Sequence, residues 1–178
     1  MKAMIYTQYG SPDRIHAAHL PNPTPKAGEV LVKIHATAIN SSDIRLLAGK
    51  PFLVRLMGYG LFKPKHIILG SDIAGRVEAV GHGVTAFKVG DAVYGDLSNY
   101  GMGGFAEYVA VTQDALAPMP NNLSFEEAAA LPLAGITALQ ALRDKAQVRA
   151  GERVAINGAS GGVGTFAVQI ARAMGAEV

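Results

Sequence analysis

The hydrophobic positions of residues 1–117 recur in short runs separated by residues that favour turns. The runs are rich in β-branched and other apolar residues, and Gly, Pro, Asn and Asp stand between them. In chain order they are KAMIYT, EVLVKIHATAI, AGRVEAVG, DAVYG and FAEYVAV. This pattern predicts that the first part of the chain is all-β.

Helical patterns follow the last of these runs. Ser124 followed by Glu127 forms the capping box that starts a helix. Pro132 is expected to end that short helix, because proline cannot continue the backbone hydrogen bonding. A second helix is predicted over 134–146.

Residues 153–174 combine an apolar run, a glycine-rich turn and a helical pattern. The uncharged run at 154–156 suits a strand buried on both faces, predicted over 152–157. Apolar residues then recur at helical spacing, at Val163, Ala167, Ile170 and Met174. A strand, a glycine turn and a helix in this order hold the pyrophosphate of a dinucleotide.

The glycine-rich turn has the spacing A-x-G-x-x-G, with Ala159, Gly161 and Gly164 where the commonest fingerprint has three glycines. Glycines let the backbone approach a phosphate, and the helix start directs free N–H groups at the anion. The residues predicted to contact the cofactor here are Gly158, Ala159, Ser160, Gly161, Gly162, Val163 and Gly164. Taken alone, such a turn is also compatible with a purely structural role.

Composition and charge narrow the class of protein. Of the 178 residues, 49% are hydrophobic and 17% are charged, a balance typical of globular domains. The net charge is +2 and the basic residues are scattered, which argues against nucleic acid as the main partner. Without cysteine, the chain forms neither disulfides nor thiolate metal sites. Neither a signal peptide nor a transmembrane segment is evident in the sequence, and a cytoplasmic location is expected.

Several longer motifs follow one another in a fixed order ahead of the glycine turn. They are EVLVKIHATAINSSDIRLLAGK, ILGSDIAGRVEAVGHGVTAFKVGDAV, GGFAEYVAV and SFEEAAALPLAGITALQAL. In that order they resemble the medium-chain dehydrogenase/reductase superfamily. The resemblance is closest to its zinc-free quinone oxidoreductases, the zeta-crystallin-like group, through AINSSD, AALPLAGITA and INGASGGVGTFAVQIAR. Ala155 departs from the signature of that group, which usually has leucine there.

This resemblance implies an α/β protein with a mainly β amino-terminal domain. A GroES-like, partly open β-barrel is expected over 1–120, and Pro and Asn residues at 118–122 mark its end. Residues 121–178 are then linker helices and the first strand, loop and helix of a truncated Rossmann doubly wound domain. Family members are considerably longer, so an uncovered apolar face and a homo-oligomer are expected.

The resemblance also bears on metal binding. Zinc-dependent relatives hold catalytic zinc with a cysteine and a histidine, and this sequence has Asn40 and Ser71 at those positions. Their structural zinc needs four closely spaced cysteines, and the chain has none. Neither zinc nor another metal is therefore expected. The histidines are expected to be surface or packed residues, because their spacing does not suit metal ligands.

Three residues are expected to act near the reacting groups. Asn40 matches the asparagine near the nicotinamide in zinc-free relatives, where it orients the ring or donates a hydrogen bond to substrate; a helix-capping role is the alternative. Asp43 lies in the family's N-x-x-D/E motif and either orients the pocket or is a solvated carboxylate in a first helical turn. Thr137 resembles a family threonine near the cofactor, or makes only a local backbone bond. Some relatives have a tyrosine where this chain has Arg45, so no proton donor is assigned.

Residues 50–66 mix large apolar side chains with cations. As a lid, this segment would offer Phe52, Leu56, Tyr59 and Phe62 as a flat apolar wall suited to quinones or alkenals. A packed surface excursion and a peripheral membrane contact are the alternatives.

These observations lead us to expect that the full-length protein is a zinc-independent NAD(P)H oxidoreductase that transfers hydride to a quinone or an α,β-unsaturated carbonyl. Poor turnover is expected from these 178 residues alone, because the adenosine half of the site is missing. NADPH is favoured over NADH by the resemblance only, since the residues that distinguish the ribose lie around the end of the second strand and beyond. The alternative is a nucleotide-binding structural or regulatory protein with the same fold and little turnover.

Overall fold

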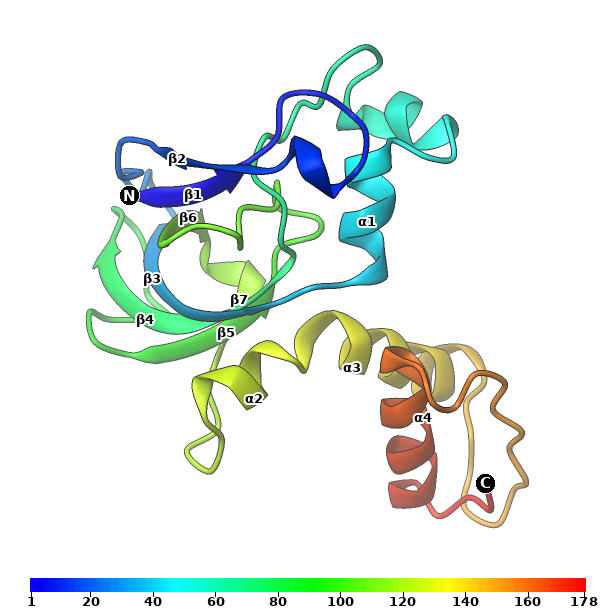
Figure 1. Ribbon diagram of the computed structural model, residues 1–178. Helices are drawn as coiled ribbons and strands as arrows, with labels where there is room; N and C mark the ends of the chain where they lie inside the picture. Colours follow the sequence, from blue (N-terminus) through cyan, green and yellow to red (C-terminus); the bar gives the residue numbers. More distant parts are fainter. The chain divides into compact units, whose positions relative to one another are not determined.

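The computed structural model describes residues 1–178, apart from the side chain of Met57. The chain forms two compact units, Met1–Ala130 and Leu131–Val178 (Figure 1). Every strand of the described chain lies in the first unit, and the second unit is helical.

A five-stranded antiparallel sheet forms the centre of the first unit, with the strand order β6–β3–β4–β5–β7. Its strands are β3 (Glu29–Ala38), β4 (Asp72–Val80), β5 (Ala92–Asp96), β6 (Tyr108–Thr112) and β7 (Leu116–Pro118). A separate hairpin pairs β1 (Lys2–Ile5) with β2 (His16–His19). The five strands predicted from the hydrophobic runs are confirmed, as β1, β3, β4, β5 and β6.

Two strands, β2 and β7, are not evident from the sequence pattern. β2 has the sequence HAAH and is largely exposed, so its side chains show no apolar alternation. β7 ends in Pro118 and lies at the edge of the sheet beside β5, where a missing backbone N–H costs no ladder hydrogen bond. Both strands form because a partner strand pairs with their backbone.

Alternate residues of the long strands build the interior of the sheet. Those of β3 and β4 include Val30, Val32, Ile73 and Val77. Gly75 lets β4 pass close to β3, because a Cβ there would lie 2.1 Å from the carbonyl oxygen of Lys33. Beside this glycine the register of the two strands shifts between Ile34 and Ala36. Shifts and glycines of this kind bend a sheet, as a partly open barrel requires.

Helix α1 (Ser41–Ala48) follows β3 and packs into a second apolar cluster. The buried members of this cluster are Tyr6, Leu46, Leu47, Leu69 and Met102. The helix ends at Gly49, whose φ of 59° is left-handed. Short helical turns elsewhere in the unit are the 3-10 helices Pro12–Arg14 (η1) and Gln113–Ala115 (η3) and the π-helix Arg55–Tyr59 (η2).

Helix α2 (Phe125–Ala129) begins at the predicted capping box, which is confirmed. The Ser124 N–H donates to the Glu127 carboxylate at 2.8 Å, and the Glu127 N–H donates to Ser124 Oγ at 3.2 Å. The helix packs on β3 and β4. Residues 121–130 therefore group with the first compact unit, which ends at Ala130.

The second unit contains α3 (Pro132–Leu139), the π-helix Gln140–Lys145 (η4) and α4 (Gly162–Ala173). The predicted helix over 134–146 corresponds to α3 and η4, and it begins at Pro132, whose fixed φ suits a first helical position. Small side chains dominate the buried cluster, which consists of Ala138, Leu142, Ala167, Ala171 and Ala176. None of the described helices has the length and apolar character that crossing a membrane requires.

The strand expected over 152–157 does not form in this structure. The segment makes a single parallel bridge, between Arg153 and Glu177. The Val154 N–H donates to the carbonyl oxygen of Glu177 at 2.8 Å, and the Glu177 N–H returns a bond to Glu152. A strand needs a partner along its length, and the paired segment in the described chain is too short to supply one.

The buried face of α4 matches the expected one except at Val163: Ala167 is buried, and Ile170 and Met174 pack against the same cluster. Val163 is 42% exposed, although the helical spacing places it on the apolar face. Gly164, Ala167 and Ala171 are the buried residues of the helix. The helix contacts α3, and its fully buried residues are small, which lets two helices approach closely.

Candidate functional site

Asn40 stands at the N-cap of α1, two residues after the end of β3. Its backbone is extended, and with Asp43 it forms the capping box that starts the helix, so the helix-capping role considered for Asn40 is present. Nδ2 donates to the Asp72 carboxylate at 2.9 Å and to Ser71 Oγ at 3.3 Å. Ser71 and Asp72 are almost completely buried, so the amide of Asn40 is held against a buried polar pair at the start of β4.

Asp43 is a buried carboxylate in the first turn of α1. One oxygen accepts the Asn40 N–H at 2.8 Å, and the other accepts the Gly70 N–H at 3.1 Å. Burial raises the pKa of Asp43, and these two backbone hydrogen bonds oppose that rise. With 3% of its surface exposed, Asp43 is not the solvated carboxylate that its position in a first turn also allowed. Through these two hydrogen bonds, Asp43 connects the backbone of Asn40 to the segment before β4.

The structure brings Asn40 and Ser71 into contact, although they lie 31 residues apart in the sequence. By the resemblance given above, these are the two positions expected to hold a cysteine and a histidine in zinc-dependent relatives. Zinc prefers thiolate, imidazole and carboxylate ligands, and an amide and a hydroxyl supply none of these. Among the described residues, no group of three or more His, Cys, Asp and Glu side chains is placed to hold a metal. That the protein works without zinc stays a prediction.

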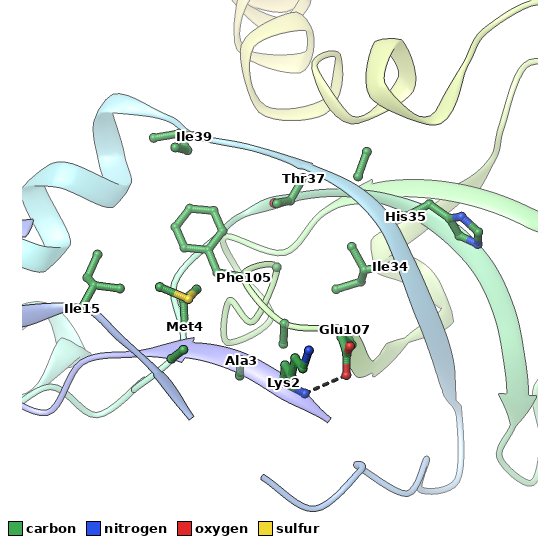
Figure 2. A pocket seen from close by; sticks show the side chains of 14 residues that line it. Lys2, Ala3, Met4, Ile15, Ile34, His35, Thr37, Ile39, Phe105 and Glu107 are labelled. Carbon is green, nitrogen blue, oxygen red and sulfur yellow. Dashed lines mark hydrogen bonds between the residues drawn. The ribbon is translucent and has the colours of Figure 1, made fainter. Parts of the chain in front are cut away.

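An open, mainly apolar pocket of about 690 Å³ lies within the first unit (Figure 2). Its apolar lining residues include Met4 of β1, Ile34 of β3 and Phe105. At one end, the backbone N–H of Lys2 donates to the Glu107 carboxylate at 2.7 Å. Its volume and lining suit a small apolar molecule.

The pocket was not foreseen from the sequence. Ile39 lines it beside Asn40, but neither Asn40 nor Asp43 is among its lining residues. The alternation along β3 identifies Ile34 as an inward residue, whereas the other walls come from segments far along the chain. No local pattern joins those segments.

The glycine-rich turn leads directly into α4, with Gly161 at the N-cap. Two of its glycines are required by the fold. Gly158 has a φ of 76°, and a Cβ on Gly164 would lie 2.1 Å from the Gly158 carbonyl oxygen. Gly161 and Gly162 have no such constraint. A Cβ on Gly161 would meet its nearest atom at 3.4 Å, and one on Gly162 would meet none within 4 Å.

The other turn residues predicted to contact a cofactor, Ala159, Ser160 and Val163, are exposed. Residues 158–163 of the turn are therefore accessible from solvent, whereas Gly164 is buried. The first N–H groups of α4 have no carbonyl one turn earlier in the helix, so they point toward this exposed side.

Thr137 lies on an exposed position of α3. Its hydroxyl donates to the carbonyl oxygen of Leu133 at 2.6 Å, which is the local backbone bond considered as its alternative role. Thr137 and the glycine turn belong to the second unit, and Asn40 and Asp43 belong to the first. The predicted site residues are thus divided between the two units.

The chain is similar in sequence to a known domain family and to known proteins. The family model described as Alcohol dehydrogenase GroES-like domain matches residues 26–121. The whole chain is 39% identical to the chloroplast envelope quinone oxidoreductase homolog of Arabidopsis thaliana and covers 54% of that protein.

Solved structures are similar to this chain in both sequence and fold. The quinone oxidoreductase from Coxiella burnetii is 34% identical with a TM-score of 0.87; the match covers 99% of this chain and 54% of that one. A mycobacterial protein solved in complex with NADPH is 32% identical with a TM-score of 0.83, over 99% of this chain and 51% of that one. The chain spans about half the length of the relatives it matches.

Proposed function

The chain belongs to the quinone oxidoreductase branch of the medium-chain dehydrogenase/reductase superfamily, and on this premise we propose that it is part of an NAD(P)H-dependent oxidoreductase. The proposed reaction delivers hydride to a quinone or an α,β-unsaturated carbonyl. The Arabidopsis and Coxiella relatives carry the name quinone oxidoreductase, which supports a quinone as acceptor.

The observation that carries this proposal is the open space at Gly161 and Gly162. Neither packing nor a left-handed backbone requires glycine at these positions. At Gly162, the first residue of α4, glycine also carries a greater loss of backbone entropy on folding than alanine would. A ligand that must come within contact distance of the backbone explains both residues, and the exposed N–H groups at the start of α4 suit its phosphates.

Asn40 is proposed to orient the nicotinamide instead of donating to the substrate. Both hydrogens of its side-chain amide are already directed at Asp72 and Ser71. Donation to a substrate oxygen would break one of these bonds, whereas holding a fixed position would not. Asp43 is a positioning residue in this scheme, since it acts on the backbone of Asn40.

A reduced nicotinamide supplies the hydride when it is bound. The chain's own contribution is to bind the pyrophosphate at the glycine turn and to orient the reacting ring from Asn40. Quinones and enones are activated acceptors, so proximity and orientation can supply much of the rate without a metal. The choice of NADPH over NADH stays a proposal, supported by the neighbour solved with NADPH.

Cofactor titration of a matched pair of variants tests the proposal. Gly162→Val is expected to weaken NADPH affinity by about tenfold or more, roughly 1.4 kcal/mol, because its side chain fills the space left for phosphate. Ala173→Val places the same side chain at an exposed position at the other end of α4 and is expected to leave affinity unchanged. Equal affinities for wild type and Gly162→Val would contradict the assignment of the turn.

Turnover separates the enzyme from the alternative function. Steady oxidation of NADPH with a quinone or an enone by the full-length protein, undiminished by a metal chelator, is the expected result. NADPH binding without consumption of either acceptor would instead favour a nucleotide-binding structural or regulatory protein. Light scattering over a concentration series tests the proposed homo-oligomer.

A further inference from the structure

Residues 50–67 form a surface excursion between α1 and β4 that exposes several large apolar side chains. These are Phe52, Leu53, Leu56, Leu61, Phe62 and Ile67. Phe62 is 90% exposed, which is unusual for so large an apolar residue. Clusters of exposed apolar residues mark surfaces that contact a partner.

The opposite side of the excursion is anchored to the first unit. Arg55 lies over the ring of Tyr9, with the guanidinium carbon 4.4 Å from the ring centroid, and its Nε donates to the carbonyl oxygen of Gly49 at 3.1 Å. The Tyr9 hydroxyl donates to the carbonyl oxygens of Tyr59 and Gly60 at 2.9 and 2.6 Å. The exposed side chains therefore form the outward face of a segment whose other side is held by specific contacts.

The charge of this region is uniform in sign. Between Ile44 and Ser71 the sequence has five basic residues, Arg45, Lys50, Arg55, Lys63 and Lys65, and no acidic one. The rest of the chain has 11 basic and 14 acidic residues, so the local excess of positive charge exceeds that of the whole chain. The flanking carboxylates, Asp43 and Asp72, are buried. A partner on this face meets apolar side chains and cations together.

We propose that the 50–67 excursion docks on the surface of a bilayer containing anionic phospholipids. Phe62 and Leu61 would enter the boundary between headgroups and acyl chains, and Lys63 and Lys65 would face the lipid phosphates. Insertion and charge attraction add to each other, and an anionic leaflet supplies both. The inference concerns binding only and does not depend on the proposed reaction.

A second copy of the chain suits this surface less well. A symmetric dimer would place the same surface on both subunits. The exposed Lys63 and Lys65 of one copy would then come close to those of the other, and like charges at an interface oppose association.

Vesicle sedimentation tests the docking. The chain is expected to bind vesicles of phosphatidylcholine mixed with phosphatidylglycerol, to bind phosphatidylcholine vesicles much less, and to dissociate as salt is added, because salt screens charge attraction. Lys63→Glu/Lys65→Glu is expected to lower the partition coefficient by about tenfold or more, and Phe62→Ser by several-fold. Lys88→Glu and Val89→Ser, at exposed positions outside the excursion, are the matched controls.

Three results would overturn the proposal. One is equal binding of the wild type to both kinds of vesicle. Another is an equal loss of binding in the Lys88 and Val89 controls. The third is an absence of vesicle binding together with self-association that Phe62→Ser abolishes, which would assign the surface to a second copy. Unchanged circular dichroism melting curves verify that the exposed substitutions leave the fold intact.

Discussion

At the scale of single residues, Asp43 connects the start of α1 to the segment before β4 through two backbone N–H groups. Asp43→Ala leaves both groups without their acceptor in a buried site. We expect a loss of about 3 kcal/mol in the free energy of unfolding, measured by urea denaturation.

The neighbouring Ser42 provides a control for this prediction. Its Oγ is buried and has no hydrogen-bond partner among the described residues. Ser42→Ala removes an unsatisfied polar atom, so its free energy of unfolding is expected to be unchanged or slightly higher. If Asp43→Ala costs no more than Ser42→Ala, the positioning role of Asp43 is wrong.

The stability of the folded chain at alkaline pH is expected to depend on the ionisation of Tyr6. Burial, followed by the nearby Tyr9, Asp43 and Tyr59, raises the pKa of Tyr6 from 10.0 to about 12. The unfolded chain therefore releases this proton at lower pH than the folded one. The contribution of Tyr6 is fully present below pH 10.0 and decreases as the pH rises toward about 12.

Denaturation at a series of alkaline pH values measures this effect. Tyr6→Phe is expected to lose less stability than the wild type between neutral and strongly alkaline pH. Tyrosinate absorbance supplies an independent reading, since one tyrosine fewer should titrate late. Parallel stability curves for the two proteins would show that Tyr6 does not carry the effect.

At the scale of elements, the start of α4 contains one glycine that packing requires, Gly164, and one that packing does not require, Gly162. Gly164→Ala brings a Cβ against the Gly158 backbone, which cannot move without distorting the turn. We expect this variant to lower the melting temperature and the helicity of the second unit.

Gly162→Ala is the matched substitution in the same helix turn. Open space surrounds its Cβ, so alanine is expected to preserve or raise stability by about 0.5–1 kcal/mol. Circular dichroism melting curves of both variants measure these two expected changes in stability. Equal destabilisation would mean that the space at Gly162 is not available to a side chain.

At the scale of the whole molecule, the two units differ in how much apolar surface their interiors bury. The first unit has valine, isoleucine and leucine side chains in its sheet cluster. The cluster of the second unit is mainly alanine. Alanine buries less apolar area per residue, and small units bury a smaller fraction of their surface.

Hydrogen exchange followed by mass spectrometry tests this difference. Amides of β3 and β4 are expected to exchange more slowly than those of α4, because local opening of the second unit costs less free energy. The exposed first turn of α4 should exchange fastest within that helix. Equal protection of β4 and α4 would contradict the expected difference in local stability.

Local patterns were sufficient for several features of this protein. The alternation in EVLVKIHATAI predicts β3, and Ser124 with Glu127 predicts the start of α2, because each signal lies within one element. The glycine turn ahead of α4 was recognised for the same reason. An absence of cysteine is likewise a property of the sequence alone.

Tertiary structure decided the features that depend on distant segments. The position of Asp43 in a first helical turn is compatible with either a solvated or a buried carboxylate. Its burial depends on another part of the chain, from which the Gly70 N–H donates to it. The meeting of Asn40 with Ser71, the pairing that makes β2 a strand and the walls of the apolar pocket arise in the same way. Hydrophobic periodicity specifies which face of an element avoids water, but the partner that covers it is set by how the whole chain packs.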